Sequence, residues 1–357
     1  MTVLVTGGSG FVGAAVIRRL LARGFDVASI AAPSDDRLFD RAALSPRCRR
    51  ITADLCDGPL VEALVEEVAP DAILHCAADG PGDHVDAGPA AFLHTNVTGT
   101  FQILEAARIW CEGRRRSFRF VHVLAEDTPG GRAWAPALAG VSTVRPARSG
   151  AAGQCASSHM VSTWGEAYGL PVVTTACAAT YGPRQCPEKL IPLMTINAIE
   201  RRVLPVFGAG TQMRDWVHVD DHAAAVERAL VHGTPGARYT IGGGDRRRTL
   251  DVVRAICAEI DRRLPQRVPR DHLIRHVPDR VCPSDRDNPA PVGTADLGWQ
   301  PSVPFDQGLA DTIGWYIRNR PWWEAMREAR YGGRRLGVLP GASAPTGRKI
   351  PVSEAVS

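Results

Sequence analysis

The first half of the chain alternates short apolar runs with amphipathic stretches. Six apolar runs have the length of buried β-strands, at residues 3–5, 27–30, 50–53, 72–75, 119–124 and 172–176. Amphipathic segments between them repeat apolar residues at helical spacing, and the longest cover residues 89–111 and 155–168. Strands that alternate with helices form βαβ units and parallel sheets. The pattern therefore predicts an α/β protein with a Rossmann-like, doubly wound parallel sheet.

The pattern becomes mixed after residue 183, where short helices, single strands and Pro/Gly turns follow one another. We expect a smaller mixed C-terminal lobe that covers the strand ends and holds the substrate. The predicted division is a Rossmann-like domain at residues 1–177 and a substrate lobe at residues 178–331, partly interleaved with it. Residues 332–357 are rich in Gly, Pro, Ser and Ala and are predicted to form a flexible tail.

Composition narrows the class of protein. The chain has 357 residues, of which 45% are hydrophobic and 22% charged, so it can bury a large core. No apolar run reaches the ~18 residues of a membrane span. Nine cysteines without a Cys-x-x-Cys pair fit reduced thiols in a cytoplasmic protein. The net charge of +4 comes with no basic run interleaved with aromatic residues, so we expect neither a nucleic-acid nor a membrane partner.

A glycine-rich turn joins the first predicted strand to the first helix: Gly7-Gly8-Ser9-Gly10-Phe11-Val12-Gly13. Glycines at this spacing allow backbone N–H groups and the positive end of a helix to approach a dinucleotide pyrophosphate. The acidic residue that usually holds the ribose is missing, because Ala31 and Ala32 end the second strand. Asp35 and Asp36 come a few residues after the end of this strand. Their negative charges would repel the 2′-phosphate of NADP, which favours NAD. Weak or non-reacting NAD remains an open alternative.

Further motifs follow in order, and with them the chain resembles the extended short-chain dehydrogenase/reductases. The motifs are Ala53-Asp54-Leu55, His75-Cys-Ala-Ala78, Thr95-Asn96-Val-Thr-Gly99 and Tyr181-Gly-Pro183. Later motifs are similar to the dTDP-glucose 4,6-dehydratase branch, namely Pro187-Glu-Lys-Leu-Ile-Pro192, Gly210-Thr-Gln-Met-Arg-Asp-Trp216 and Val219-Asp-Asp-His222. The resemblance spans about residues 1–330 and implies a Rossmann domain holding NAD, a small lobe holding a nucleotide sugar, and a homodimer formed through two long helices per subunit.

The resemblance also implies binding residues. For NAD these are Gly7, Gly10, Phe11, Val12 and Gly13 at the pyrophosphate, Asp54 and Leu55 at the adenine, Ala77 and Ala78 along the dinucleotide, and Asn96 near the strand ends. For the nucleotide diphosphate they are Lys189, Leu190, Phe207 under the base, Arg214 and Arg286. Guanidinium groups suit a diphosphate because they donate paired hydrogen bonds to its oxygens. No histidine spacing suggests a metal site.

The oxidising residues of the family are missing at the matching positions. The family uses Tyr-x-x-x-Lys, in which lysine lowers the pKa of the tyrosine so that it acts as a base, but these places hold Gly150 and Gln154. None of the five tyrosines has a lysine four residues later, and the family's catalytic Ser/Thr falls on Ala125. We therefore expect no ordinary dTDP-glucose 4,6-dehydratase activity.

An acid pair remains, because Glu126 and Asp127 stand where the family places an Asp-Glu couple. Acting on a substrate that already carries a ketone, the pair could catalyse an epimerisation or an elimination without a hydride step, as an isomerase or lyase. Two acids after a strand are also commonly a solvated loop. Two further hypotheses stay open: a silent homologue that partners an active enzyme, and a natural-product cyclase that reuses the cavity.

Overall fold

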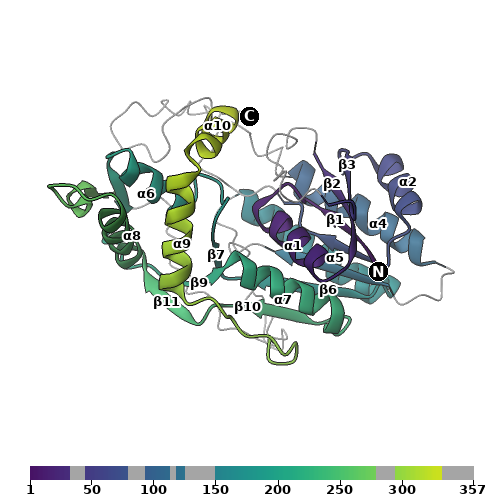
Figure 1. Cartoon of the computed structure of the whole chain (residues 1–357). Helices are drawn as coiled ribbons and strands as arrows, with labels where there is room; N and C mark the ends of the chain where they lie inside the picture. Colours follow the sequence, from purple (N-terminus) through teal and green to yellow (C-terminus); the bar gives the residue numbers. More distant parts are fainter. Residues whose placement is uncertain (33–44, 79–92, 113–117, 125–148, 279–293, 332–357) are drawn as a thin grey trace, which may run out of the picture.

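The computed structural model describes residues 1–32, 45–78, 93–112, 118–124, 149–278 and 294–331 (Figure 1). Its main element is a seven-stranded sheet in the order β10-β6-β5-β4-β1-β2-β3, and every neighbouring pair is parallel. The strands are β1 (Thr2–Thr6), β2 (Asp26–Ala31), β3 (Cys48–Thr52), β4 (Ala72–His75), β5 (Arg119–Leu124), β6 (Val172–Cys177) and β10 (Arg238–Ile241). The predicted α/β class with a parallel Rossmann-like sheet is confirmed.

Helices cover both faces of this sheet. Successive side chains of a strand point to opposite faces, and in β1 Val3 and Val5 pack with one helix layer while Leu4 packs with the other. The first layer contains α1 (Phe11–Ala22) and α7 (Val219–His232). The second contains α2 (Gly58–Val68), α4 (Thr100–Cys111) and α5 (Ser149–Tyr168). The sheet is thus doubly wound, as predicted.

A smaller lobe lies on the other side of the molecule from α2 and α4 (Figure 1). It has a three-stranded sheet β11-β9-β7 and a two-stranded sheet β12-β8. The strands are β7 (Ala179–Tyr181), β8 (Leu204–Phe207), β9 (Met213–His218), β11 (Asp245–Arg248) and β12 (Ile274–Val277). The helices are α6 (Leu190–Ile199), α8 (Thr249–Arg263), α9 (Phe305–Arg318), α10 (Arg320–Tyr331) and the short 3₁₀ turn η4 (Arg270–Leu273).

The chain crosses between the two parts more than once. After β9 it contributes α7 and β10 to the large sheet and then returns to the lobe with β11 and α8. The boundary at residue 177 remains a prediction, and the predicted tail at residues 332–357 lies outside the described residues. Among the helices in the described ranges, none is long and apolar enough to cross a membrane.

Asp221 on α7 ties the large sheet to the lobe. Its side chain is 4% exposed, and its carboxylate accepts hydrogen bonds from the backbone N–H groups of Ser302 and Val303 at 3.0 and 2.9 Å. The Ser302 hydroxyl donates a third bond at 2.6 Å, and the Trp299 indole donates to the Asp221 carbonyl at 3.1 Å. Because α9 begins at Phe305, these bonds hold the start of a lobe helix against a helix of the large sheet.

We predict that Asp221→Ala lowers the free energy of unfolding by about 3 kcal/mol, because it removes the buried charged acceptor of two backbone N–H groups and of the Ser302 hydroxyl. Chemical denaturation monitored by circular dichroism measures this. The matched control is Asp220→Ala, since Asp220 is the exposed neighbour on the same helix. Equal effects of the two substitutions would contradict the role given to Asp221.

Candidate functional site

The glycine-rich turn between β1 and α1 needs its glycines for steric reasons. Gly7 has φ +69°, and a Cβ added there would lie 2.7 Å from the backbone N and Cα of Ala77, which follows β4. A Cβ at Gly13 would lie 2.2 Å from the Gly7 carbonyl oxygen. The turn is also fixed by its backbone, because Gly7 N–H donates to the Ile30 carbonyl at 3.0 Å. A side chain at either position would force α1 away from the strand ends.

The first turn of α1 is suited to an anion. Gly10 is the N-cap residue in an extended conformation, it is exposed, and no side chain of the described residues caps the helix there. The first N–H groups of a helix have no intrahelical acceptor, and they carry partial positive charge. No acidic residue lies in this first turn. The N–H groups that follow Gly10 can therefore bind a pyrophosphate, as predicted for Phe11 and Val12.

A buried chain of hydrogen bonds connects the ends of β1 and β4 to the next helix. His75 Nδ1 lies 2.7 Å from Thr6 Oγ1, and His75 Nε2 lies 2.9 Å from Thr100 Oγ1. Ala77 N–H donates to Thr6 Oγ1 at 3.3 Å, and Thr100 Oγ1 donates to the Asn96 carbonyl at 2.7 Å. The Thr100 hydroxyl donates to Asn96, so it accepts from Nε2–H of the ring. Burial lowers the pKa of His75 to about 4, so Nδ1 carries no hydrogen and accepts from the Thr6 hydroxyl. The imidazole is therefore neutral.

The remaining predicted cofactor residues lie at the same carboxyl edge. Asp54 is exposed and Leu55 buried in the turn after β3, and Ala77 is half-buried and Ala78 exposed after β4. Asn96 is 1% exposed and belongs to η3 (His94–Gly99), a π-helical segment that continues into α4. The structure therefore gathers the glycine-rich turn, the β4 end and η3. Sequence patterns did not predict that residues 94–99 form a π-helical segment. They also did not predict the roles of Thr6 and Thr100, because no recognisable spacing of residues marks these threonines.

The predicted substrate residues that the structure describes lie in the smaller lobe. Lys189 is the exposed N-cap of α6, directly before Leu190, and Phe207 is half-buried at the end of β8. Arg214 is half-buried on β9, opposite Arg247 of β11 in the strand register. Three further predicted residues lie outside the described residues, namely Glu126, Asp127 and Arg286.

Two tyrosines of the described core, Tyr181 and Tyr316, are not arranged as bases. Tyr181 and Tyr316 are almost fully buried, and each donates its hydroxyl to a backbone carbonyl, of Phe305 and Gln185 respectively. Burial raises the pKa of Tyr181 and of Tyr316 above the usual value for tyrosine. Gln154, on α5, is 3% exposed and carries an uncharged amide. It cannot supply the positive charge by which a lysine lowers a tyrosine pKa.

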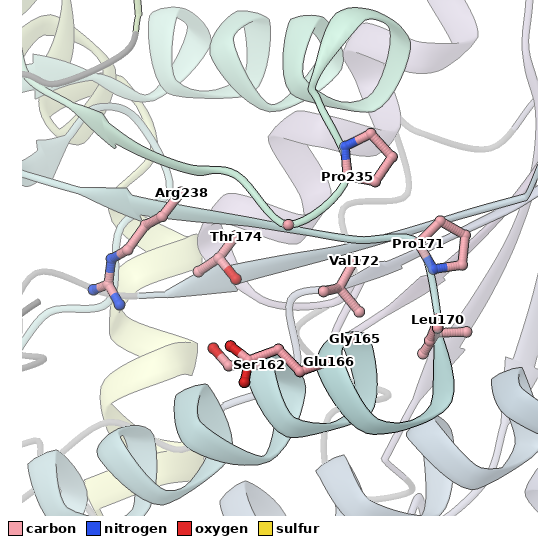
Figure 2. Close-up of a pocket in the computed structure, with 11 residues that line it drawn as sticks. Ser162, Gly165, Glu166, Leu170, Pro171, Val172, Thr174, Pro235 and Arg238 are labelled. Carbon is pink, nitrogen blue, oxygen red and sulfur yellow. The ribbon is translucent and has the colours of Figure 1, made fainter. Parts of the chain in front are cut away.

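A separate cavity of about 320 Å³ lies at the opposite edge of the sheet (Figure 2). The second half of α5 and the starts of β6 and β10 line it, and its polar lining comes from Ser162, Glu166, Thr174 and Arg238. In doubly wound sheets, ligands bind outside the carboxyl ends of the strands. This cavity lies at the amino ends of β6 and β10, so it is not part of the candidate cofactor site.

The doubly wound sheet and the glycine-rich turn define a protein of the nucleotide-binding Rossmann class. Comparison with known proteins gives the family: the model of the NAD dependent epimerase/dehydratase family matches residues 3–242. The chain belongs to this family, as the sequence motifs predicted.

Curated relatives match nearly the whole chain. A probable dTDP-glucose 4,6-dehydratase of Sinorhizobium fredii is 37% identical over 95% of this chain and 99% of its own length. A dTDP-glucose 4,6-dehydratase of Escherichia coli is 36% identical over 95% of this chain and 100% of its own length.

Solved structures of similar proteins contain NAD. A Streptomyces venezuelae dTDP-glucose 4,6-dehydratase, solved as a double mutant with NAD and a nucleotide-sugar ligand, has a TM-score of 0.77 and 32% identity, over 91% of this chain and 100% of that one. A Bacillus anthracis dTDP-glucose 4,6-dehydratase in complex with NAD has a TM-score of 0.76 and 27% identity, over 91% of this chain and 99% of that one. The predicted cofactor agrees with both.

The buried histidines predict acid lability. Burial lowers the pKa of both His75 and His222 from 6.5 to about 4. Such a histidine is neutral in the folded chain but protonated in the unfolded chain at intermediate pH. The free energy of unfolding therefore falls as the pH drops from 6.5 towards 4, and each histidine contributes up to about 3 kcal/mol.

Urea unfolding at several pH values measures this slope. His222→Gln removes one titrating group and is expected to flatten the dependence, whereas His272→Gln, at an exposed histidine, leaves it unchanged. A stability that does not change between pH 6.5 and pH 4 would rule out the neutral, buried state of these rings.

Proposed function

We propose that the protein binds NAD without oxidising its substrate and performs redox-neutral acid/base chemistry on a nucleotide sugar or a related keto metabolite. The reaction is an epimerisation or an elimination, with Glu126 and Asp127 as the acid and base. The observation that carries the proposal is a glycine-rich turn suited to a pyrophosphate together with an uncharged, buried residue at position 154. Gly7, Gly10 and Gly13 keep the geometry for the dinucleotide, whereas buried Gln154 stands where the resemblance implies lysine.

The position of Tyr168 also supports the loss of hydride chemistry. Tyr168 is exposed at the end of α5, and 18 residues separate it from Gly150. At a rise of 1.5 Å per residue this is roughly 27 Å along the helix, so Tyr168 lies far from the position where the family's tyrosine would stand. Loss of a positioned base costs about 10²–10⁴ in rate. Oxidation of an unactivated hydroxyl would thus be too slow to be the function.

The acid pair follows β5 directly in the chain. In the sheet, β5 lies between β4 and β6. Leu124 is the last residue of β5, and Glu126 comes two positions later in the chain. A ketone in the substrate acidifies the adjacent C–H bond, so a carboxylate can remove that proton and a carboxylic acid can return one to carbon or to a leaving hydroxyl. NAD then acts as a bound, non-reacting ligand.

A homodimer is part of the proposal. Phe101 on α4 is 40% exposed and Tyr168 on α5 is 57% exposed. The Trp164 ring lies edge-on to both, at centroid distances of 5.9 and 5.4 Å, so the three rings form one continuous apolar strip across the two helices. Such a strip on paired helices suits packing against the same surface of a second subunit.

Deuterium exchange tests the acid/base role. Incubation with a dTDP-4-keto-6-deoxy sugar in D₂O is expected to raise the mass of the sugar, and Glu126→Gln combined with Asp127→Asn is expected to abolish the uptake. The control is Glu62→Gln combined with Glu66→Gln, two exposed carboxylates on α2. Uptake that survives in the first double variant would exclude the acid pair. No uptake by the unaltered protein would favour the silent homologue.

Nucleotide binding is tested separately. Lys189→Ala combined with Arg214→Ala is expected to weaken dTDP binding at least about tenfold, because each charge-assisted bond to phosphate contributes about 1.5–3 kcal/mol. NAD affinity, measured by calorimetry on the same protein, should stay unchanged. Arg254→Ala, at an exposed arginine on α8, is the control. Undiminished dTDP binding in the double variant would favour a cavity reused for another substrate.

A further inference from the structure

Three metal-binding side chains of different types meet beside the candidate cofactor site. Asp54 and Cys56 belong to the turn after β3, and His94 opens η3. A carboxylate oxygen of Asp54, Cys56 Sγ and a ring nitrogen of His94 all lie within 4.8 Å of one another. His94 Nε2 lies 3.9 Å from Asp54 Oδ2. Two segments about forty positions apart in the chain therefore supply one cluster.

Local bonds hold this cluster in place. The backbone N–H of Cys56 donates to Asp54 Oδ1 at 2.9 Å, and the Cys56 thiol lies 3.3 Å from the His94 carbonyl oxygen, to which it donates. Gly99, at the end of η3, allows the close approach. A Cβ there would lie 3.3 Å from Leu55 Cβ and 3.8 Å from Cys56 Sγ. The turn and the π-helical segment thus pack closely, with Cys56 and His94 on facing sides of the contact.

The donor set matches a zinc-class ion. Thiolate, imidazole and carboxylate are all zinc ligands, and three protein ligands with one open position are common where zinc also binds water or a substrate. With bond lengths of about 2.0–2.3 Å, tetrahedral ligand atoms lie roughly 3.3–3.5 Å apart. The separation of 3.9 Å between His94 Nε2 and Asp54 Oδ2 is close to this spacing. The side chains of Asp54 and His94 are 61% and 60% exposed, so an ion can enter from solvent.

A surface ion pair would account for His94 and Asp54, but it would not account for the Cys56 thiol beside them. We propose that Asp54, Cys56 and His94 form a binding site for a divalent ion of the zinc class. Binding exchanges the Cys56 thiol proton for a sulfur–metal bond, and the proton is released to solvent. The fourth position takes water. This site is distinct from the predicted acid pair and requires no reaction of NAD.

The proposal has a consequence for the cofactor, which rests on the function proposed above. Asp54 is also the residue predicted to contact adenine, so a metal ion on its carboxylate excludes the adenine ring from the same place. Zinc and NAD are therefore expected to compete. The competition needs Cys56 and His94 beside the carboxylate.

Cobalt(II) titration of the full-length, metal-free protein tests the site. Coordination of cobalt by a thiolate gives a sulfur-to-metal absorption band, which is expected to saturate at one ion per chain and to disappear when zinc is added. Cys56→Ser is expected to abolish the band. Loss of an outer-shell partner already costs about 10–100-fold in metal affinity, so His94→Gln, which removes a ligand, should weaken binding at least about tenfold.

Cys111→Ser and His272→Gln are the matched controls, because they change a half-buried cysteine and an exposed histidine elsewhere. Both are expected to retain the band. A band that persists in Cys56→Ser, or its absence from the unaltered protein, overturns the site. Circular dichroism on each variant confirms that the chain is folded.

Calorimetric titration of NAD at several zinc concentrations tests the competition. The apparent affinity for NAD is expected to fall as zinc rises in the unaltered protein and to stay constant in Cys56→Ser. A cobalt band without any effect of zinc on NAD overturns the competition while the metal site stands. Failure of NAD to bind the zinc-free protein contradicts the cofactor function instead, so the two failures are distinguishable.

Discussion

The neutral imidazole of His75 holds the candidate cofactor site in shape. It is fully buried, and its two nitrogens join the Thr6 hydroxyl at the end of β1 to the Thr100 hydroxyl at the start of α4. A protonated ring would direct N–H groups at both hydroxyls and break the order of donors and acceptors. This constraint matters because Gly7 and Ala77 already approach as closely as glycine allows. A shift of the β4 end would move Ala77 relative to the glycine-rich turn, beside the α1 terminus where the pyrophosphate is proposed to bind.

The sequence predicts those parts of the fold whose causes are local. Runs such as residues 72–75 and 119–124 are apolar because both faces of the strand are buried, and they match β4 and β5. The glycine-rich turn is likewise recognisable from its spacing. Strand β10 cannot be recognised from the sequence, because Arg238–Ile241 is short and its place depends on pairing with β6, more than sixty residues earlier in the chain. The helix predicted for residues 89–111 is found as η3 and α4 in its described part, and the π-helical turn has no signal in the residue pattern.

The candidate site also has parts that the sequence predicts and parts that it does not. Contacts that use backbone, such as those of Gly7 and Gly13, follow from glycine spacing and are matched by close approaches in the structure. Contacts that depend on the meeting of distant side chains do not follow from spacing. The association of Cys56 with His94 depends on Gly99 packing against Leu55, which is a property of the folded chain. For this reason no spacing pattern in the sequence indicates a metal site at Asp54, Cys56 and His94.

Binding and catalysis are separable in this fold, because the backbone forms the cofactor turn whereas single side chains perform the chemistry. Gln154 is uncharged and cannot activate a tyrosine, yet the sheet, the glycine-rich turn and α5, in which Gln154 is buried, are all formed. A chain that keeps the dinucleotide turn without the base can retain NAD as a structural ligand. NAD binding then stabilises the folded state by an amount that grows with the logarithm of the ratio of the NAD concentration to the dissociation constant. An ion that competes at Asp54 would act on stability through the same linkage, so the proposed metal site bears on folding as well as on the cofactor.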